Sequence, residues 1–181
     1  MFLSIDQTAK HRQRKIKLAI ASAIIAAGAA GLSATSYAAT ATGTMAVSTS
    51  VLMSCTISAG AMTFASYYPT ADAAVDGTAT IQSSCTKGGA AIITMGQGSN
   101  ANAGSTPAAP GRQMSNGDAR LAYGIYSDGD HSAAIGDTAE TGLAVTGTGG
   151  AFGTAVYGRI PAGQAVGVGS FSDQVMIVVT F

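Results

Sequence analysis

The sequence predicts an all-β protein, an antiparallel β-sandwich built from short strands. Its last residues, SFSDQVMIVVTF, alternate with period two and are rich in β-branched side chains, as expected of a strand. Other short apolar runs lie between stretches of Gly, Ser, Asn and Pro, a spacing that is typical of a sandwich. After residue 38, no segment shows the period of about 3.6 residues that an amphipathic helix requires.

The first 38 residues have the composition of a secretory signal peptide. Five Lys and Arg residues precede residue 18, and Leu18–Leu32 is an uncharged run of 15 small and apolar residues. Ser36-Tyr37-Ala38 then offers small residues where a signal peptidase cuts. A membrane anchor is the alternative, but this run is shorter than the roughly 20 residues that span a bilayer. We therefore expect removal of residues 1–38, export of Ala39–Phe181 and no stable membrane insertion.

The exported part carries a net negative charge. Five of the nine Lys and Arg residues lie in the first 38, as does one of the nine Asp and Glu residues, which leaves four bases against eight acids. Such a chain, with no basic patch, is not expected to bind nucleic acid. Its 143 residues (181 less 38) have the length of one domain.

An alternating run precedes the first cysteine of the exported part. Met45, Val47, Thr49, Val51 and Met53 share one face of an extended segment. Two interpretations fit this pattern equally well. The run is either the first strand of its own sheet or a strand that leaves its domain to complete another chain.

Both cysteines, Cys55 and Cys85, lie in the exported part. An even pair in an exported chain predicts one disulfide, which closes a loop of 30 residues. Zinc binding is the alternative, but two thiols without a nearby His are too few ligands for a closed site. We therefore expect a disulfide and no metal.

Six strands are predicted from period-two alternation between turn residues. The glycine-rich segments 97–111 and 146–153 are predicted to be loops. The predicted strands are Ser54–Ser58, Thr78–Ser84, Ala90–Met95, Leu121–Tyr126, Ala155–Ile160 and Gln174–Phe181.

The terminal strand is apolar on both faces. Val175, Ile177, Val179 and Phe181 alternate with Met176, Val178 and Thr180 in the sequence. Such a strand is expected to be buried and to need a neighbour on each edge. Its free edge is therefore a place where another chain is expected to complete the fold.

Catalytic patterns are weak in this chain. His131 lies in Asp128-Gly129-Asp130-His131, which is typical of a polar hairpin turn. Asp128, Asp130 and Asp137 do not follow the spacing of a helix-loop-helix calcium site. Gly163, Gly167 and Gly169 precede a strand, whereas a phosphate loop opens a helix. We expect no catalytic residue, no cofactor and no metal.

Several segments resemble, in order, the spore coat protein U domain family, whose members include subunits of Csu-type archaic chaperone-usher pili. The family commonly has Trp before a Gly-Asp where this chain has Ile135. The matching segments are RQMSNG at 112–117, LAYGIYSD at 121–128, IGD at 135–137, VYGRIPAGQ at 156–164 and SFSDQVMIVVTF at 170–181.

The resemblance implies an incomplete immunoglobulin-like sandwich that lacks its last strand. In such pilins a periplasmic chaperone lends a strand, and at the outer-membrane usher the N-terminal extension of the next subunit replaces it. The expected divisions are a signal peptide at 1–38, a donor-strand extension at 39–53 and a pilin domain at 54–181. The extension would donate Met45, Val47, Thr49 and Val51. The acceptor groove and chaperone-contacting strand would use Val175, Met176, Ile177, Val178, Val179 and Phe181.

The implied function is structural, in a pilus at the cell surface that supports adhesion and biofilm formation. The implied partners are the chaperone, the usher and neighbouring pilin subunits. One alternative is a spore or cell-surface coat protein. Another is a secreted carbohydrate-binding or hydrolytic sandwich, which would need an aromatic or carboxylate-lined cleft. The absence of Trp and the presence of only six Tyr disfavour that alternative.

Overall fold

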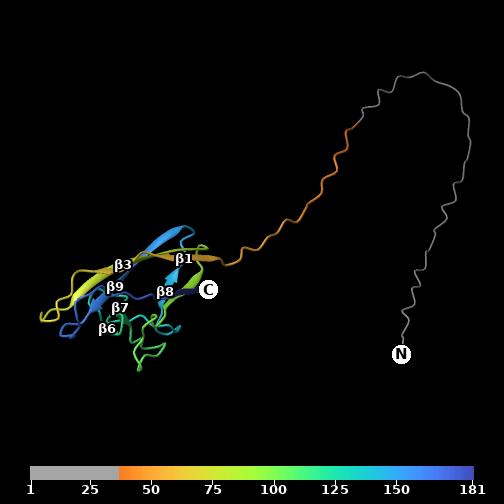
Figure 1. The fold of residues 1–181 in the computed structure, drawn as a ribbon. Helices are drawn as coiled ribbons and strands as arrows, with labels where there is room; N and C mark the ends of the chain where they lie inside the picture. The colour runs from red at the N-terminus through yellow and green to blue at the C-terminus, as the bar shows by residue number, and fades with distance from the viewer. Residues whose placement is uncertain (1–36) are drawn as a thin grey trace, which may run out of the picture. The chain divides into compact units, whose positions relative to one another are not determined.

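A computed structural model of the chain describes residues 37–181. The predicted signal peptide therefore lies outside the described residues, apart from Tyr37 and Ala38. Contacts divide the chain into two units between Val47 and Ser48, and all strands of residues 37–181 belong to the second unit. In Figure 1 the labelled strands lie together within the second unit.

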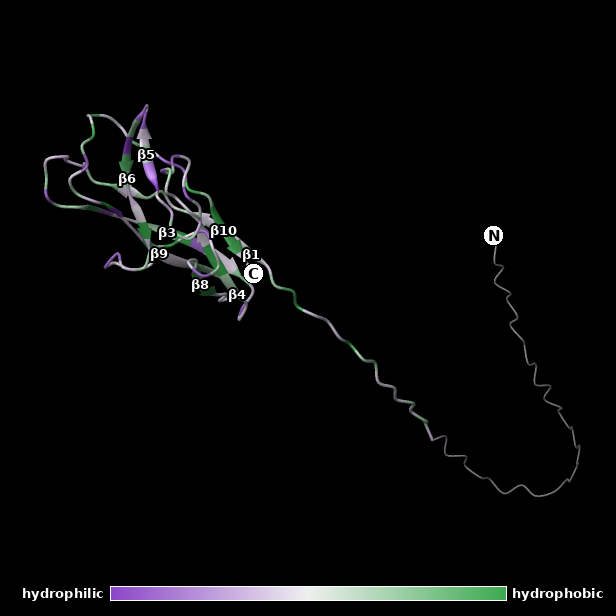
Figure 2. Ribbon diagram, turned by 90° about the horizontal axis from the view of Figure 1, so that it is seen from below, coloured by the Kyte–Doolittle hydropathy of each residue, from purple (hydrophilic) through white to green (hydrophobic). Residues whose placement is uncertain are grey.

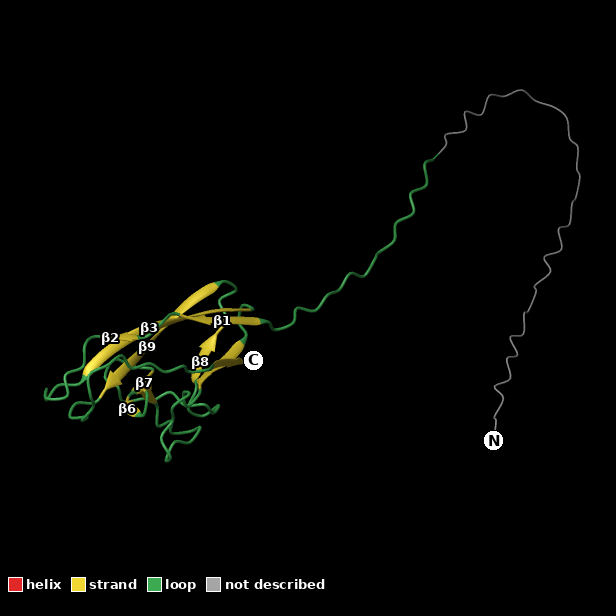
Figure 3. Cartoon of the chain, viewed as in Figure 1, coloured by secondary structure: helices red, strands yellow, loops and turns green. Residues whose placement is uncertain are grey.

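The larger sheet has five antiparallel strands. Its order is β1-β3-β9-β7, and the short β2 pairs with β3 beyond the end of β1. The long ladder between β3 and β9 forms its centre, and Figure 3 shows these strands running along the length of the domain. Its strands are β1 (Cys55–Ala59), β2 (Thr63–Phe64), β3 (Val75–Cys85), β7 (Gly124–Tyr126) and β9 (Ala151–Ile160).

A second antiparallel sheet has the order β10-β4-β8, and a separate hairpin joins β5 to β6. Gly117 lies at the hairpin turn with a φ of 57°, a conformation that glycine adopts without steric cost. These strands are β4 (Ala90–Met95), β5 (Gln113–Asn116), β6 (Ala119–Ala122), β8 (Leu143–Thr146) and β10 (Ile177–Thr180).

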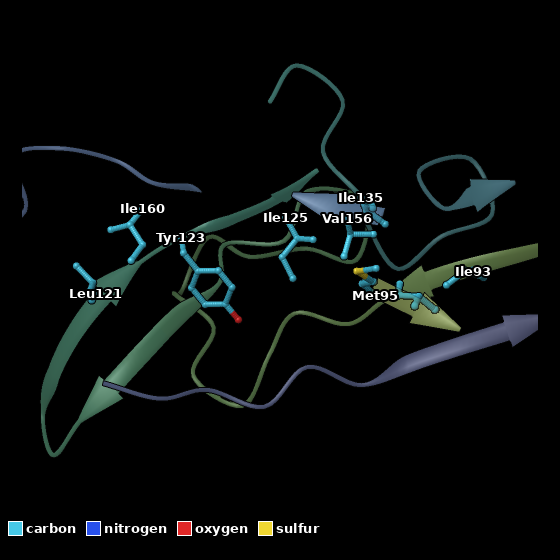
Figure 4. Packing of buried hydrophobic residues seen from close by; sticks show 9 residues of the cluster. Ile93, Met95, Leu121, Tyr123, Ile125, Ile135, Val156 and Ile160 are labelled. Carbon is cyan, nitrogen blue, oxygen red and sulfur yellow. The ribbon is translucent and has the colours of Figure 1, made fainter. Parts of the chain in front are cut away.

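One apolar core draws on both sheets and the hairpin. Figure 4 shows it as an elongated row of side chains, with Leu121 and Ile160 at one end and Ile93 at the other. Because β3 and β9 of one sheet and β4 of the other contribute to a single cluster, the two sheets form a sandwich. The buried residues are Ile81, Ile93, Met95, Leu121, Tyr123, Ile125, Ile135, Val156 and Ile160.

The predicted antiparallel all-β fold is confirmed, and no helix occurs among residues 37–181. The structure also forms the Cys55–Cys85 disulfide, between two residues that are direct partners in the β1–β3 ladder. Within the described part of the chain, no helix is long and apolar enough to cross a membrane.

Several predicted strands and loops differ in detail from the structure. The predicted strand 121–126 is divided at Tyr123, whose amide donates to the carbonyl of Arg112 at 3.1 Å, so the chain leaves the hairpin for the larger sheet. The predicted loop 146–153 ends early, because β9 already begins at Ala151. The terminal strand is shorter than predicted and covers Ile177–Thr180.

Candidate functional site

The first and last strands leave an open edge on each sheet. β1 pairs only with β3, and β10 pairs only with β4. Their Cα atoms approach within 8 Å although no ladder joins them, and Figure 2 shows the two strands beside each other. The sandwich is therefore open along the line where β1 and β10 meet.

The open edge of the terminal segment extends well beyond β10. The carbonyl of Met176 accepts from Gly96 N at 2.8 Å, and that of Gln174 accepts from Ser99 N at 3.0 Å. Ser172 exchanges two backbone hydrogen bonds with Ser115. Because backbone groups alternate in direction along an extended chain, those of the intervening odd-numbered residues point the other way. The edge thus offers unpaired strand positions from Phe171 to Val179.

Beside this edge lies an apolar depression, which we call the edge groove. It comprises a cavity of about 310 Å³ and an adjoining cavity of about 760 Å³. Both have walls from Met62, Phe64, Met114 and Phe171. The smaller cavity reaches the sandwich core at Ile81, Met95, Ile125 and Val156, and the terminal segment at Val175 and Ile177. Its shape and lining suit a row of apolar side chains on an extended strand.

One carboxylate stands in the wall of the smaller cavity. Asp173 Oδ2 accepts from the Tyr123 hydroxyl at 2.8 Å, and Oδ1 accepts from Ser99 N at 2.9 Å and Asn100 Nδ2 at 3.0 Å. Burial, together with the bond to Asp173, raises the pKa of Tyr123 far above its usual value, so its hydroxyl remains a donor. Asp173 is therefore held rigidly in an otherwise apolar wall.

A buried arginine supports the same end of the groove. Arg112 is 2 % exposed. Its Nε donates to Gly96 O at 2.8 Å, and Nη2 donates to Met95 O at 2.6 Å and Ile135 O at 3.0 Å. Burial lowers the pKa of this guanidinium, while the nearby Asp137 and Asp173 oppose that effect. Arg112 thus connects the end of β4 to the segments around it.

The predicted groove residues divide between two faces of the terminal segment. Val175, Ile177 and Val179 pack against the core. By contrast, Met176 and Val178 on the other face are 75 % and 41 % exposed, and Phe181, although it belongs to the odd-numbered series, is 57 % exposed. The expected burial of both faces is therefore not found, and only the inner face lines the edge groove.

The predicted donor-strand residues have exposed side chains. Met45 and Val47 are each 86 % exposed, Val51 is 81 % exposed, and Thr49 is also exposed. Tyr37–Ser54 contains no strand. Nearer the first strand, the carbonyl of Leu52 accepts from Thr86 Oγ1 at 3.3 Å, and Ser54 N donates to the same hydroxyl at 3.0 Å.

The polar turn around His131 has the expected hairpin character. Asp128 accepts from the amides of Ser132 and Ala133, and these bonds hold its pKa below the usual value. The His131 side chain is 5 % exposed and lies 3.6 Å from Asp76. Tyr126 and Tyr157 pack edge-on against its ring. Among the described residues, no group of three or more His, Cys, Asp or Glu side chains is placed to hold a metal ion.

Several groove residues were not predicted from the sequence. Met62 and Phe64 lie on a stretch that includes a strand of two residues, too short to show alternation. Phe171 and Asp173 continue the odd-numbered pattern of the terminal strand, so extending that period backwards would have found them. No sequence pattern could identify Tyr123 as a groove residue, because its role depends on where the chain passes from the hairpin to the larger sheet.

Comparison with known proteins gives consistent matches. The model of one family, described as the Spore Coat Protein U domain, matches residues 41–178. Protein U of Myxococcus xanthus is 37 % identical over 177 residues, which cover 92 % of this chain and 98 % of that protein.

A solved structure shares the fold. It is the CsuC–CsuE chaperone–tip adhesion subunit pre-assembly complex from archaic chaperone-usher Csu pili of Acinetobacter baumannii. The TM-score is 0.51 at 17 % sequence identity. The match covers 72 % of this chain but only 40 % of the other, so this chain spans less than half of that protein.

Proposed function

Because the chain belongs to the spore coat protein U domain family, we propose that it is a structural subunit of a surface pilus assembled by the chaperone-usher pathway. The family membership confirms the resemblance found in the sequence. The proposed role is non-catalytic and uses donor-strand complementation, in which the next subunit fills the edge groove. Export through the periplasm and display at the cell surface, in support of adhesion and biofilm formation, belong to the same proposal.

The edge groove is the observation that carries this proposal. A sandwich with two adjacent unpaired edges and an apolar depression between them is an incomplete fold, since such edges recruit further strands. One added strand would pair its backbone along the terminal segment and insert alternate side chains between the sheets. An extended segment with one apolar face is therefore the expected occupant.

Residues 39–53 have the chemistry of that occupant. In this proposal residues 1–38 are the signal peptide, residues 39–53 the donor-strand extension and residues 54–181 the pilin domain. Met45, Val47 and Val51 supply three large apolar side chains, and Thr49 a smaller one. Burying the three would contribute on the order of 5 to 9 kcal/mol before ordering costs. A non-covalent joint of that size is suited to a fibre.

The partners follow from the open groove. A periplasmic chaperone is proposed to occupy it first, with contact along Val175, Ile177 and Val179. An outer-membrane usher would then exchange the chaperone strand for the extension of the next subunit. The solved relative is itself a chaperone–subunit pre-assembly complex, which supports the chaperone part of this proposal.

A coat protein of spores or cells is the second candidate. The family description and the match along nearly the whole of Protein U favour it. Its subunits would share the open groove, but the assembled material would form a layer instead of fibres. Electron microscopy of cells that express the chain with its chaperone and usher distinguishes the two forms.

Periplasmic expression with and without the chaperone tests the proposal. Alone, the subunit should be degraded or should polymerise, because the apolar groove remains open. With the chaperone it should be recovered as a soluble one-to-one complex. A stable, monodisperse monomer in the absence of chaperone would overturn the donor-strand function.

A further inference from the structure

We propose that Asp173 sets the register of the inserted strand by accepting a hydrogen bond from the Thr49 hydroxyl of a second copy of this chain. This inference rests on the proposed function and deepens it, because it names a specificity-determining contact within the edge groove. It follows from matching one polar position on each of two apolar faces.

The groove side has a regular inner face. The odd-numbered residues of the terminal segment share the backbone direction of its open edge and an inward side-chain direction. Four of these five positions are apolar and pack against the core, and Asp173 is the exception. In order they are Phe171, Asp173, Val175, Ile177 and Val179.

Asp173 has capacity for one more donor. Its Oδ1 accepts from Ser99 N and Asn100 Nδ2, whereas Oδ2 accepts only from the Tyr123 hydroxyl within the described residues. Each carboxylate oxygen can accept about two hydrogen bonds, so Oδ2 has one position left. Because Asp173 lines the smaller cavity, a strand inserted there would pass its side chain.

The extension carries the complementary pattern. Among Met45, Val47, Thr49 and Val51, only Thr49 has a hydrogen-bond donor on its side chain. In the proposed joint all four side chains enter the edge groove. A hydroxyl that enters an apolar groove without a partner is destabilising, so Thr49 needs an acceptor at its own position.

An antiparallel strand satisfies this need. Every ladder of the β10-β4-β8 sheet is antiparallel. An added strand that runs antiparallel to the terminal segment therefore continues this sheet. With Thr49 beside Asp173, Val47 lies beside Val175 and Val51 beside Phe171, because both chains advance two residues per inner position. Met45 then lies beside Ile177. All four positions are matched in polarity.

A slip of two residues breaks the match twice. The carboxylate of Asp173 would then face Val47 or Val51, and the Thr49 hydroxyl would face an apolar side chain. A hydrogen bond to a charged group contributes about 1.5 to 3 kcal/mol, which corresponds to roughly a 10- to 100-fold effect on affinity. The single polar pair therefore favours one register among several that bury equal apolar area.

The test uses the complex of the mature chain with its chaperone and fluorescent peptides of residues 39–53. Exchange of the peptide for the chaperone is followed, and then the rate at which the peptide leaves the subunit. The Thr49→Val peptide replaces the hydroxyl with a methyl group of similar size, and should dissociate about 10- to 100-fold faster than the unchanged peptide. The Thr49→Ser peptide keeps the hydroxyl and should dissociate much more slowly than the Thr49→Val peptide.

A composition-matched control moves the hydroxyl by one inner position. The peptide with Val47→Thr and Thr49→Val has the same composition as the unchanged peptide and should dissociate at least as fast as the single Thr49→Val peptide, because the relocated hydroxyl then faces Val175. On subunits with Asp173→Asn, the difference between the unchanged peptide and the Thr49→Val peptide should shrink, since the charged acceptor is gone.

The outcomes separate this inference from the proposed function. Valine is more apolar than threonine, so without the Asp173 contact the Thr49→Val peptide would bind as tightly as the unchanged one, or more tightly. That result overturns the register role and leaves donor-strand insertion intact. Failure of the unchanged peptide to replace the chaperone counts against donor-strand insertion itself.

Discussion

Tyr123 and Arg112 each join separate parts of the chain through buried polar groups. Tyr123 packs its ring against Phe64, with centroids 6.2 Å apart, while its hydroxyl donates to Asp173. Arg112 donates to the carbonyls of three residues from two segments. Leaving a buried acceptor unpaired costs about 1 to 3 kcal/mol. Substitution of either residue should therefore lower stability by more than the loss of its side-chain packing alone.

Tyr123 should make the free energy of unfolding fall as the pH becomes alkaline. Its pKa is raised in the folded state, while the unfolded chain has a value near 10. The stabilising contribution is therefore complete below about pH 10 and declines above it, because only the unfolded state loses the proton. Between pH 8 and pH 10.5, the urea midpoint of unfolding should fall less for Tyr123→Phe than for the unchanged chain. Tyr68→Phe, at a residue 66 % exposed, should decline like the unchanged chain.

Arg112→Met should destabilise the chaperone-bound or strand-completed domain by about 3 kcal/mol or more, since it leaves buried carbonyls without donors. Arg120 provides the control, because within residues 37–181 its side chain donates only to the nearby carbonyls of Gly117 and Ala119. Arg120→Met should change the free energy of unfolding by less than about 0.5 kcal/mol. Equal losses in both variants would contradict the role assigned to Arg112.

At the scale of elements, the terminal strand shows what the sequence could and could not predict. Period-two alternation located most strands, and β4 was found with its observed bounds, Ala90–Met95. Alternation could not tell which face of Val175–Phe181 lies inward, because both faces are apolar. It also missed β2, β5 and β8, which have two, four and four residues, because such short runs give little periodicity.

The two faces of β10 should respond differently to charge. Ile177 packs against the core, whereas Val178 is 41 % exposed on the other face. Ile177→Asp would bury an unpaired carboxylate and should abolish recovery of a soluble chaperone complex. Val178→Asp should leave that recovery nearly unchanged. Pull-down of each variant with the chaperone makes the comparison, and similar yields would show that the inner face does not line the binding site.

At the scale of the whole molecule, folding and assembly are separable if residues 39–53 serve the next subunit. The described strands all lie after that extension, beginning with Cys55. A change in the extension should therefore spare the domain that carries it, while it harms the joint with the neighbouring domain. In the proposed joint, the open edges and the extension would divide one sandwich between two copies of the chain.

Val47→Asp tests this separation. In the proposed joint it places a charge in the neighbour's apolar groove, where desolvation costs several kcal/mol. The variant should be captured by the chaperone normally, yet surface fibres should be absent by electron microscopy. Thr42→Asp, nearer the start of the extension, is the matched control and should still form fibres. Loss of chaperone capture by Val47→Asp would mean that the segment belongs to its own sheet.

The Cys55–Cys85 bridge has a mechanical consequence for a chain pulled through its extension. Tension along residues 39–53 enters the domain at β1, the edge strand of the larger sheet. There the bridge passes the load covalently to β3, which is held by its long ladder with β9. Peeling β1 from the sheet therefore requires breaking a covalent bond. In the proposed fibre, the non-covalent joint between subunits should therefore yield under traction before the edge of the domain does.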